Sequence, residues 1–226
     1  PRPWRKRLHV DPSVYAWIGG WTFDKDDNRV ELNFDTCYPM VEGEDEQSPV
    51  RIGHVRKDTC PHCGGHMVDM LVLDGRDERL KVLGIDGILT AVCCPNCVGF
   101  LQGPAFNSFT LDGGAEVFPS KLFDGEETTD CYVRPEHYKA LAENKYILGK
   151  APVPLFYGAC SEDVNTVGGF ANWVQDAEYT TCPRCKKPMK YLAQIQWDTV
   201  MDGTEGTLYI EFCPECHIVS MQHQQT

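Results

Sequence analysis

The sequence predicts a mainly β fold of the α+β class, built from two zinc-ribbon-like β units that are related by internal duplication, with one short helix between them. Three observations carry this prediction: four CxxC pairs, two segments that resemble each other, and strand-like runs between the cysteine pairs. We expect an N-terminal unit over residues 1–120 and a C-terminal unit over residues 121–226, packed as one compact body. With 226 residues and 42% hydrophobic side chains, the chain can bury a sizeable core.

The two similar segments are residues 59–103 and residues 181–222. Each opens with Thr-Cys-Pro-x-Cys and ends its last strand-like run in Cys-Pro-x-Cys. Each also has a methionine four residues after its second cysteine, Met67 in the first segment and Met189 in the second. Agreement in both order and spacing predicts an internal duplication.

Strand-like runs follow and precede the cysteine pairs. In the second segment, residues 191–198 (YLAQIQWD) have apolar side chains at alternate positions, and residues 207–212 (TLYIEF) are rich in β-branched and aromatic side chains. A turn at Asp202 and Gly203 separates them. Residues 67–73 and 88–93 are the corresponding strand-like runs of the first segment. Pairing the two strands of a unit would bring its two CxxC pairs together.

The remaining chain is less regular. Residues 135–146 (PEHYKALAENKY) predict the short helix, because Pro135 suits a first helical position and good helix formers follow it. Residues 41–49 and 123–130 are acidic and predict loops, and residues 151–154 (APVP) predict an extended segment.

The cysteine pattern predicts two structural zinc ions. Zinc binds four thiolates in a tetrahedron, and a CxxC turn points two sulfurs at one ion. The proline after the first cysteine of each pair helps to fix that turn. A site made of two such knuckles is closed to water and serves folding, so we expect no catalysis there and no enzyme. The predicted ligands are Cys60, Cys63, Cys94 and Cys97 in the first site and Cys182, Cys185, Cys213 and Cys216 in the second.

Other uses of these cysteines stay open at this stage. The spacings are C-x2-C-x30-C-x2-C and C-x2-C-x27-C-x2-C, with longer inserts than in common zinc ribbons. Redox dithiols and disulfides are the alternatives to zinc, and the knuckles of the two units could exchange partners. Four cysteines have no assigned role, and for each we expect a buried free thiol: Cys37, Cys93, Cys131 and Cys160.

Charge indicates the kind of partner. The net charge is −12, and both halves are acidic: residues 1–113 carry 12 basic and 17 acidic side chains, and residues 114–226 carry 9 and 16. An acidic field repels phosphate, so nucleic-acid binding is not expected, and a basic protein partner is favoured. None of these patterns predicts an oligomeric state.

Composition also indicates a location. The chain has no apolar run of 18 residues, so we expect no membrane span. Residues 1–10 (PRPWRKRLHV) are basic without an apolar run behind them, unlike a secretory signal. Adjacent CxxC pairs without such a signal favour metal binding in a reducing compartment, and we therefore expect a cytoplasmic protein.

Catalytic patterns are weak. Cys160 with His137 is a formal nucleophile–base pair, but its flanking residues do not mark an active site. His62, His66 and His217 lie beside predicted ligands, and we expect them at the surface. The sequence contains no GxGxxG motif, no P-loop and no HxE…PCxxC deaminase signature.

Residues 167–222 also resemble known families. In order they contain a Gly-Gly turn, a tryptophan, a CPxC knuckle, a methionine, an L-x-Q strand and a strand that ends in a second knuckle. This segment resembles the zinc-containing branch of the YwqG-like domain family and is similar to the N-terminal part of the programmed-cell-death-protein-2-like family. The residues Ile18, Gly19, Gly20 and Trp21 echo the Gly-Gly-Trp motif in the first half. The matching positions are Val167, Gly168, Gly169, Trp173, Gln194, Cys182, Cys185, Cys213 and Cys216.

The resemblance implies a protein partner. The eukaryotic relatives resemble dedicated chaperones of a basic ribosomal protein, and bacterial YwqG-like proteins are related to toxin-neutralising immunity proteins. We therefore expect a zinc-stabilised protein-interaction module of one of these kinds. The alternatives are an enzyme with a site away from zinc, using His137 or the acidic loops, and a zinc-ribbon protein that binds nucleic acid. Against the last, the one basic stretch is residues 2–7.

Overall fold

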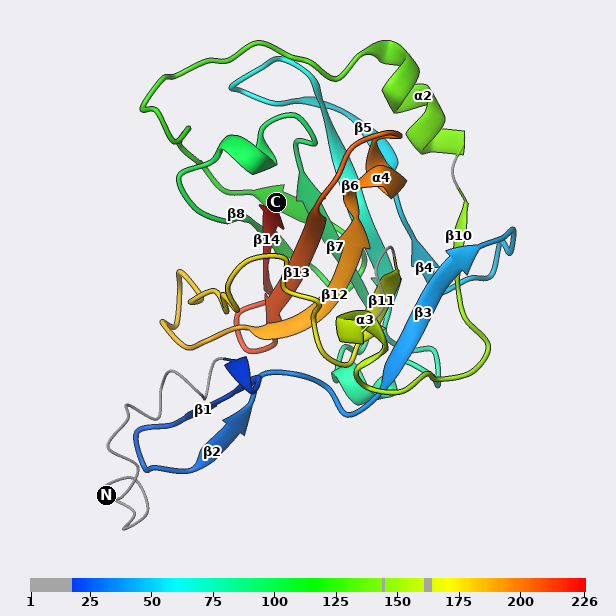
Figure 1. The fold of residues 1–226 in the computed structure, drawn as a ribbon, viewed down its shortest axis with the longest axis vertical. Coiled ribbons are helices and arrows are strands. Elements are labelled where there is room, and N and C mark those ends of the chain that lie inside the picture. Colours follow the sequence, from blue (N-terminus) through cyan, green and yellow to red (C-terminus); the bar gives the residue numbers. More distant parts are fainter. Residues whose placement is uncertain (1–17, 144, 161–163) are drawn as a thin grey trace.

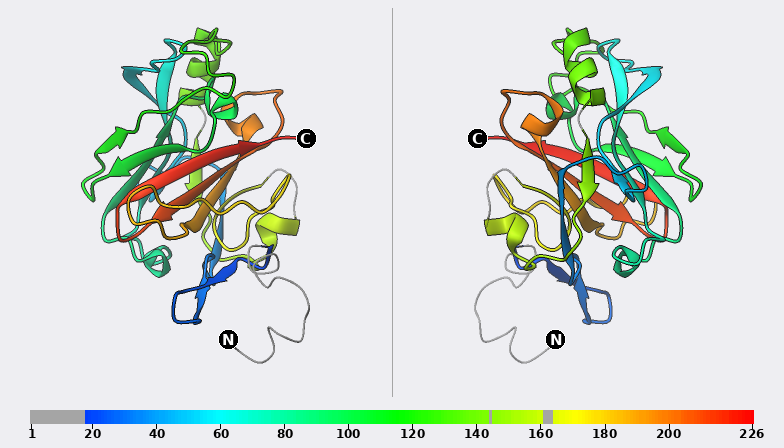
Figure 2. Two further views of the ribbon diagram at one scale, coloured as in Figure 1. Left: turned by 90° about the vertical axis from the view of Figure 1, so that its left-hand side faces the viewer. Right: turned by 90° about the vertical axis from the view of Figure 1, so that its right-hand side faces the viewer.

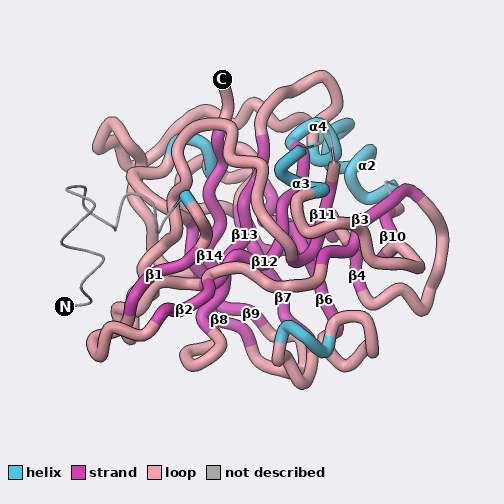
Figure 3. Tube along the Cα trace, turned by 60° about the horizontal axis from the view of Figure 1, so that its bottom comes forward, coloured by secondary structure: helices cyan, strands magenta, loops and turns pink. Residues whose placement is uncertain are grey.

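The computed structural model describes residues 18–143, 145–160 and 164–226. Strands dominate the described residues and helices are few and short, which confirms the mainly β prediction (Figure 3). The strands form an eight-stranded sheet, a four-stranded sheet and a two-stranded ribbon (Figure 1). Among the described helices, none is long and apolar enough to cross a membrane.

The eight-stranded sheet is antiparallel throughout, in the order β10-β3-β11-β12-β13-β14-β8-β9. Three of its strands precede residue 120 and five follow it, so both predicted units contribute to one sheet. The boundary at 120/121 itself stays a prediction. The strands are β3 (Cys37–Glu42), β8 (Ala105–Phe109), β9 (Ala115–Val117), β10 (Tyr146–Leu148), β11 (Asn165–Gly168), β12 (Lys190–Gln196), β13 (Thr207–Cys213) and β14 (Ile218–Gln224).

The four-stranded sheet is centred on β6. Strand β7 pairs with one edge of β6, and β4 and β5 pair with successive parts of its other edge. The ribbon β1–β2 lies at one end of the molecule and helix α2 at the other (Figure 2). The strands are β1 (Trp21–Phe23), β2 (Arg29–Glu31), β4 (Val50–Arg51), β5 (His54–Thr59), β6 (His66–Asp74) and β7 (Ile88–Cys93).

One hydrophobic core joins the two larger sheets. Leu71 and Leu73 on β6 belong to the same buried cluster as Leu192 and Ile195 on β12. All four side chains are fully buried, as expected for strands with a full hydrophobic face. Burial of this size across both sheets explains why the halves fold as one packed structure.

A buried side chain also bridges the sheets. Asn107 on β8 is fully buried, and its Oδ1 accepts a hydrogen bond from the Val92 amide at 2.9 Å. Its Nδ2 donates to the Thr90 carbonyl at 2.8 Å. The amide of Asn107 thereby pairs with the outer edge of β7 much as a neighbouring strand would, which satisfies backbone groups that burial would otherwise leave unpaired.

The helices are short. The predicted helix over 135–146 is present but ends at Glu143, and Tyr146 already begins β10. The strand predicted over 191–198 ends at Gln196, because the chain turns into a helix at Trp197. The α-helices are α2 (Pro135–Glu143), α3 (Tyr157–Cys160) and α4 (Trp197–Val200), and the 3-10 helices are η1 (Lys81–Leu83) and η2 (Val98–Phe100).

Candidate metal centres

Two hairpins carry the cysteine groups, and their registers match. Strand β6 pairs with β7, and β12 pairs with β13, both antiparallel. In each hairpin the eighth residue after the first cysteine pairs with the residue just before the third cysteine. In each hairpin a β-bulge then follows the next residue pair, Asp69↔Val92 in the first and Tyr191↔Glu211 in the second. The corresponding pairs are Val68↔Cys93 with Lys190↔Phe212, and Leu71↔Ala91 with Ala193↔Ile210.

The first knuckle of each unit is also folded alike. The amide of the first cysteine donates to the carbonyl five residues later, and the amide four residues later donates back to the first cysteine's carbonyl. The fourth residue after the first cysteine has a positive φ in both units, 72° at Gly64 and 62° at Lys186. These two bonds are 2.7 and 2.9 Å long in the first unit (Cys60, Gly64, Gly65) and 2.8 and 3.0 Å in the second (Cys182, Lys186, Lys187).

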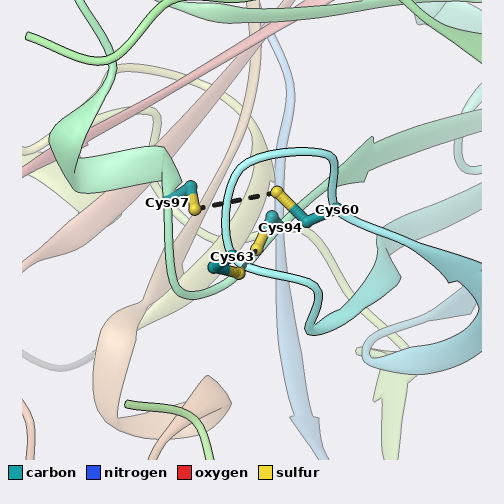
Figure 4. A group of neighbouring side chains, drawn as sticks. All are labelled: Cys60, Cys63, Cys94 and Cys97. Atoms are coloured by element: carbon teal, nitrogen blue, oxygen red, sulfur yellow. Dashed lines mark hydrogen bonds between the residues drawn. The ribbon is translucent and has the colours of Figure 1, made fainter. Parts of the chain in front are cut away.

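The eight cysteines named from the sequence form two groups of four, each within one unit. In each group the four sulfurs lie within 4.8 Å of one another. Four sulfurs at about 2.3 Å from a central ion would lie about 3.8 Å apart. Sulfur–sulfur distances in the first group, drawn in Figure 4, fit that geometry: 3.7 Å for Cys60–Cys97 and 3.5 Å for Cys63–Cys94. In the second group the Cys185–Cys213 distance of 3.6 Å fits it as well.

The donor sets suit a soft or borderline metal ion. Four thiolates close a tetrahedral site and leave no position for water or substrate. Within the first group, contacts with the thiols of Cys94 and Cys97 lower the pKa of Cys60, and the same contacts with Cys60 raise the pKa of Cys94 and of Cys97. The residues present therefore fit a structural ion at both places, and nothing in the donor set provides for catalysis.

A loop covers the first group. We call residues 120–133 the strap. Two intervening residues of the knuckles, His62 and Asn96, bind the strap from either side of the cysteines. Their bonds join His62 Nδ1 to the Glu127 carbonyl (2.9 Å), the Thr129 amide to the His62 carbonyl (3.0 Å), Asn96 Nδ2 to the Asp130 carbonyl (2.9 Å) and the Tyr132 amide to Asn96 Oδ1 (2.7 Å).

The second group is more open. Two of its ligands, Cys185 and Cys216, are half-buried, whereas in the first group only Cys63 is. Its knuckles are tied to each other instead of to a strap: Arg184 Nη1 donates to the Cys216 carbonyl at 3.1 Å, and Lys187 pairs with Glu215. Two ligand residues of the second group are therefore partly exposed to solvent.

The cysteines without a role differ among themselves. Cys37 and Cys93 are buried as expected, and desolvation raises the pKa of Cys37 to about 11. The expectation was wrong for Cys131, which is exposed because it lies on the strap. A Cβ at Gly65 would lie 2.7 Å from Cys131 Sγ and 3.4 Å from Cys63 Sγ, so a fifth thiol stands within about 6 Å of a ligand. The side chain of Cys160 lies outside the described residues.

The structure describes one side chain of the candidate catalytic pair, that of His137. His137 lies in the first turn of α2, where its Nδ1 accepts a hydrogen bond from the Arg134 amide at 3.1 Å. Its partner Cys160 has no described side chain. Of the histidines beside the ligands, His66 is exposed and packs its ring edge-on to Tyr138, whereas His62 and His217 are half-buried. The surface prediction thus holds fully for His66, and His62 and His217 are partly exposed.

The sequence analysis did not predict β4, the strand that precedes β5 and the first knuckle. Strand β4 pairs with β6 through Arg51↔Val72, and β11 pairs with β12 through Thr166↔Gln194. Val72 and Gln194 are each twelve residues past the first cysteine of their unit, so β4 occupies the place of β11. Two residues later, both chains turn at a glycine of positive φ, 84° at Gly53 and 73° at Gly168. The counterpart of the Gly168 turn is therefore Gly53, and not the Gly19–Gly20 pair.

Comparison with known proteins gives one relative. The chain is 26% identical, over 231 aligned positions, to a protein of Salmonella typhimurium described as the uncharacterized protein YpfL. The alignment includes all of this chain and 53% of that protein, so the chain spans about half the length of the curated relative that it matches. No family model matches the chain, and no solved structure matches it.

Proposed function

We propose that the chain is a zinc-stabilised protein-interaction module that binds a basic protein. The observation that carries the proposal is the pair of closed four-cysteine groups, each at the end of a strand hairpin. Closed thiolate sites contribute to folding free energy, so function falls to the surfaces that the hairpins support. Zinc is the ion we assign, because all-thiolate tetrahedral sites are typical of structural zinc.

We further propose that the two units arose by duplication. The support is geometric: the same register, the same bulge position and the same knuckle bonds occur in both hairpins. Even the bridge before the strands corresponds, with Thr59↔His66 in one unit and Thr181↔Pro188 in the other. Independent origins would have to reproduce each of these details separately.

Charge supports the choice of partner. A net charge of −12 speeds encounter with a basic protein and repels nucleic acid. The resemblance to the zinc-containing YwqG-like and programmed-cell-death-protein-2-like families suggests two forms of this function: neutralising a toxin, or escorting a basic client. Thiolate ligands need a reducing environment, which is consistent with the cytoplasm.

Two measurements test the proposal. Elemental analysis of the purified protein should give about two zinc ions per chain, and a chelator that removes them should abolish the β-sheet circular dichroism cooperatively. Affinity capture, with the zinc-loaded protein as bait, should recover a basic protein in a salt-sensitive manner. A metal-free protein that stays fully folded would refute the structural role of the ions. Capture of acidic or neutral partners only would refute the choice of partner.

A further inference from the structure

A groove of about 680 Å³ lies beside the first cysteine group. One wall is the knuckle itself, through Pro95 and Asn96, together with the following η2. The second wall is the end of the strap, and the third is α4 with the turn that joins β12 to β13. The groove thus lies where the two units and the strap meet, away from the metal ligands themselves.

Apolar side chains line this groove and remain open to solvent. Phe100 on η2 is 55% exposed, and Tyr132 on the strap is 65% exposed. Met201 adds an apolar side chain, and Trp197, 5% exposed, also lines the groove. Phe123, 80% exposed, is tied to the same place because its amide donates to the Phe100 carbonyl at 2.8 Å. Exposed aromatic side chains gathered in one place are typical of a binding surface.

The charge around the groove is negative. Its lining includes Asp202 and Glu205 and, over the described residues, no lysine or arginine. The strap, of which Tyr132 and Val133 line the groove, carries four exposed carboxylates along its length, with Lys121 as its basic residue. Aromatic side chains in a negative field complement a segment that carries both apolar and cationic side chains, since cations also bind aromatic faces. The exposed carboxylates of the strap are Asp124, Glu126, Glu127 and Asp130.

We propose that this groove binds a basic, extended segment of the partner protein. An apolar side chain of the segment packs on Phe100 and Tyr132, and flanking lysine or arginine side chains face Asp202 and Glu205. The inference rests on the proposed function, and it adds the surface and the chemistry of the bound segment. It also explains why the strap is fixed to the knuckles: Asn96 holds Tyr132 by a 2.7 Å hydrogen bond, so the first metal centre sets the position of the aromatic wall.

A selection experiment tests this assignment. A phage-displayed library of random dodecapeptides is selected on the zinc-loaded protein, and the enriched peptides are synthesised and titrated by fluorescence anisotropy. The peptides should combine lysine or arginine with leucine or aromatic residues. Replacing Phe100 and Tyr132 together by alanine should weaken binding by at least about tenfold, because exposed aromatic anchors dominate such contacts. Asp202→Asn with Glu205→Gln should weaken binding less and flatten its salt dependence.

Phe156→Ala is the matched control. Phe156 is also an exposed aromatic residue, at 57%, but it stacks on Phe170 and is not part of the groove. Its replacement should leave peptide affinity unchanged, and thermal melts should show that all variants fold. Basic peptides that bind equally well to the groove variants would refute the groove as the binding site, but would not refute the preference for a basic partner. Selected peptides without positive charge, or no enrichment at all, would overturn both.

Discussion

The two cysteine hairpins have the same internal geometry but different connections. In the first unit the chain passes from the turn at Gly53 directly along β6 as strand β5. In the second unit it leaves the sheet at Gly168 and returns at Thr181, and the Tyr191 amide on the vacated edge donates to the Leu32 carbonyl at 2.8 Å. Register and knuckle are thus alike in the two units, whereas the connection before them differs.

The longer connection of the second unit supplies an aromatic cluster. Trp173 and Tyr179 lie on it and pack against Tyr191 and Tyr209 of the hairpin. The Tyr209 hydroxyl donates to the Asn172 carbonyl, which fixes the connection to β13. The Gly-Gly-Trp motif therefore serves local packing in the second unit, and the first unit does without it because β5 covers the same edge.

Removing one ligand from each unit should give the largest effects and should separate the units. Structural zinc contributes on the order of 10 kcal/mol in small zinc domains, which is comparable to the whole stability of a typical protein. Cys182→Ser should remove the proposed ion from the hairpin at the centre of the eight-stranded sheet, and we expect global unfolding near 25 °C. Cys60→Ser should remove the proposed ion from the smaller sheet, and we expect a less stable protein that retains about one zinc ion.

Two controls accompany these variants. Cys37→Ser should change the urea midpoint far less, because Cys37 is a buried thiol outside both groups. Cys131→Ser should retain about two zinc ions per chain, although its sulfur is close to Cys63. Equal stabilities of Cys182→Ser and Cys37→Ser would contradict the ligand assignment, and so would loss of one ion in Cys131→Ser.

A buried carboxyl group gives the hairpins different pH responses. Glu211 on β13 occupies the register position of Val92 on β7. Glu211 is fully buried, and desolvation raises its pKa to about 8 although the Thr180 amide donates to its Oε2 at 2.7 Å. Its ordinary pKa is 4.5, so between about pH 4.5 and pH 8 the unfolded chain ionises Glu211 while the folded protein keeps the proton. Glu211 therefore costs stability increasingly across that range, and the cost is constant above it.

Replacing Glu211 by glutamine should remove this dependence. The free energy of unfolding of Glu211→Gln minus that of the unmodified protein should rise from pH 5 to pH 8, by on the order of 4 kcal/mol. Taking the difference at each pH cancels the protonation of the thiolates, which both proteins share. Urea titrations at several pH values provide the measurement. A difference that is flat with pH would show that Glu211 is already ionised in the folded protein.

Asn107 tests how differently the last strands of the hairpins are paired. In the second unit β13 has a full backbone partner in β14, whereas β7 relies on the side chain of Asn107 at Val92 and Thr90. Asn107→Ala leaves a buried amide and a buried carbonyl unpaired, and we expect a loss of about 3 kcal/mol. Ser108→Ala, on the same strand, is the control. A loss in Asn107→Ala no larger than in the control would mean that water replaces the amide.

Local pattern predicted the hairpins well and the sheets poorly. The CxxC spacing identified both cysteine groups, because a knuckle depends on a few neighbouring residues, and residues 135–143 were recognisable as helix from their first-turn proline. The pairing of β3 with β11, or of β8 with β14, joins residues more than a hundred positions apart, and no periodicity within a strand encodes its distant neighbour. Residues 123–130 were predicted as an acidic loop, but the attachment of the strap to His62 and Asn96 depends on tertiary contacts.

The smallest predicted effect comes from the most direct correspondence between the units. Lys186 and Gly64 occupy the same place in the first knuckle, both with positive φ. A residue with a Cβ is strained there by about 1 kcal/mol, and glycine is not. Lys186→Gly should therefore stabilise the protein by about that amount, less the greater entropy of glycine in the unfolded chain.

The reverse change supplies the matching measurement. Gly64→Ala should destabilise by a similar amount, and purely through the backbone, because a Cβ at Gly64 would have no atom within 4 Å. Thermal melts of both zinc-loaded variants suffice. Opposite shifts of comparable size would show that the two knuckles respond alike to backbone strain. Shifts of the same sign would show that the knuckles, despite their matching bonds, respond differently, and the proposed duplication would lose one of its supports.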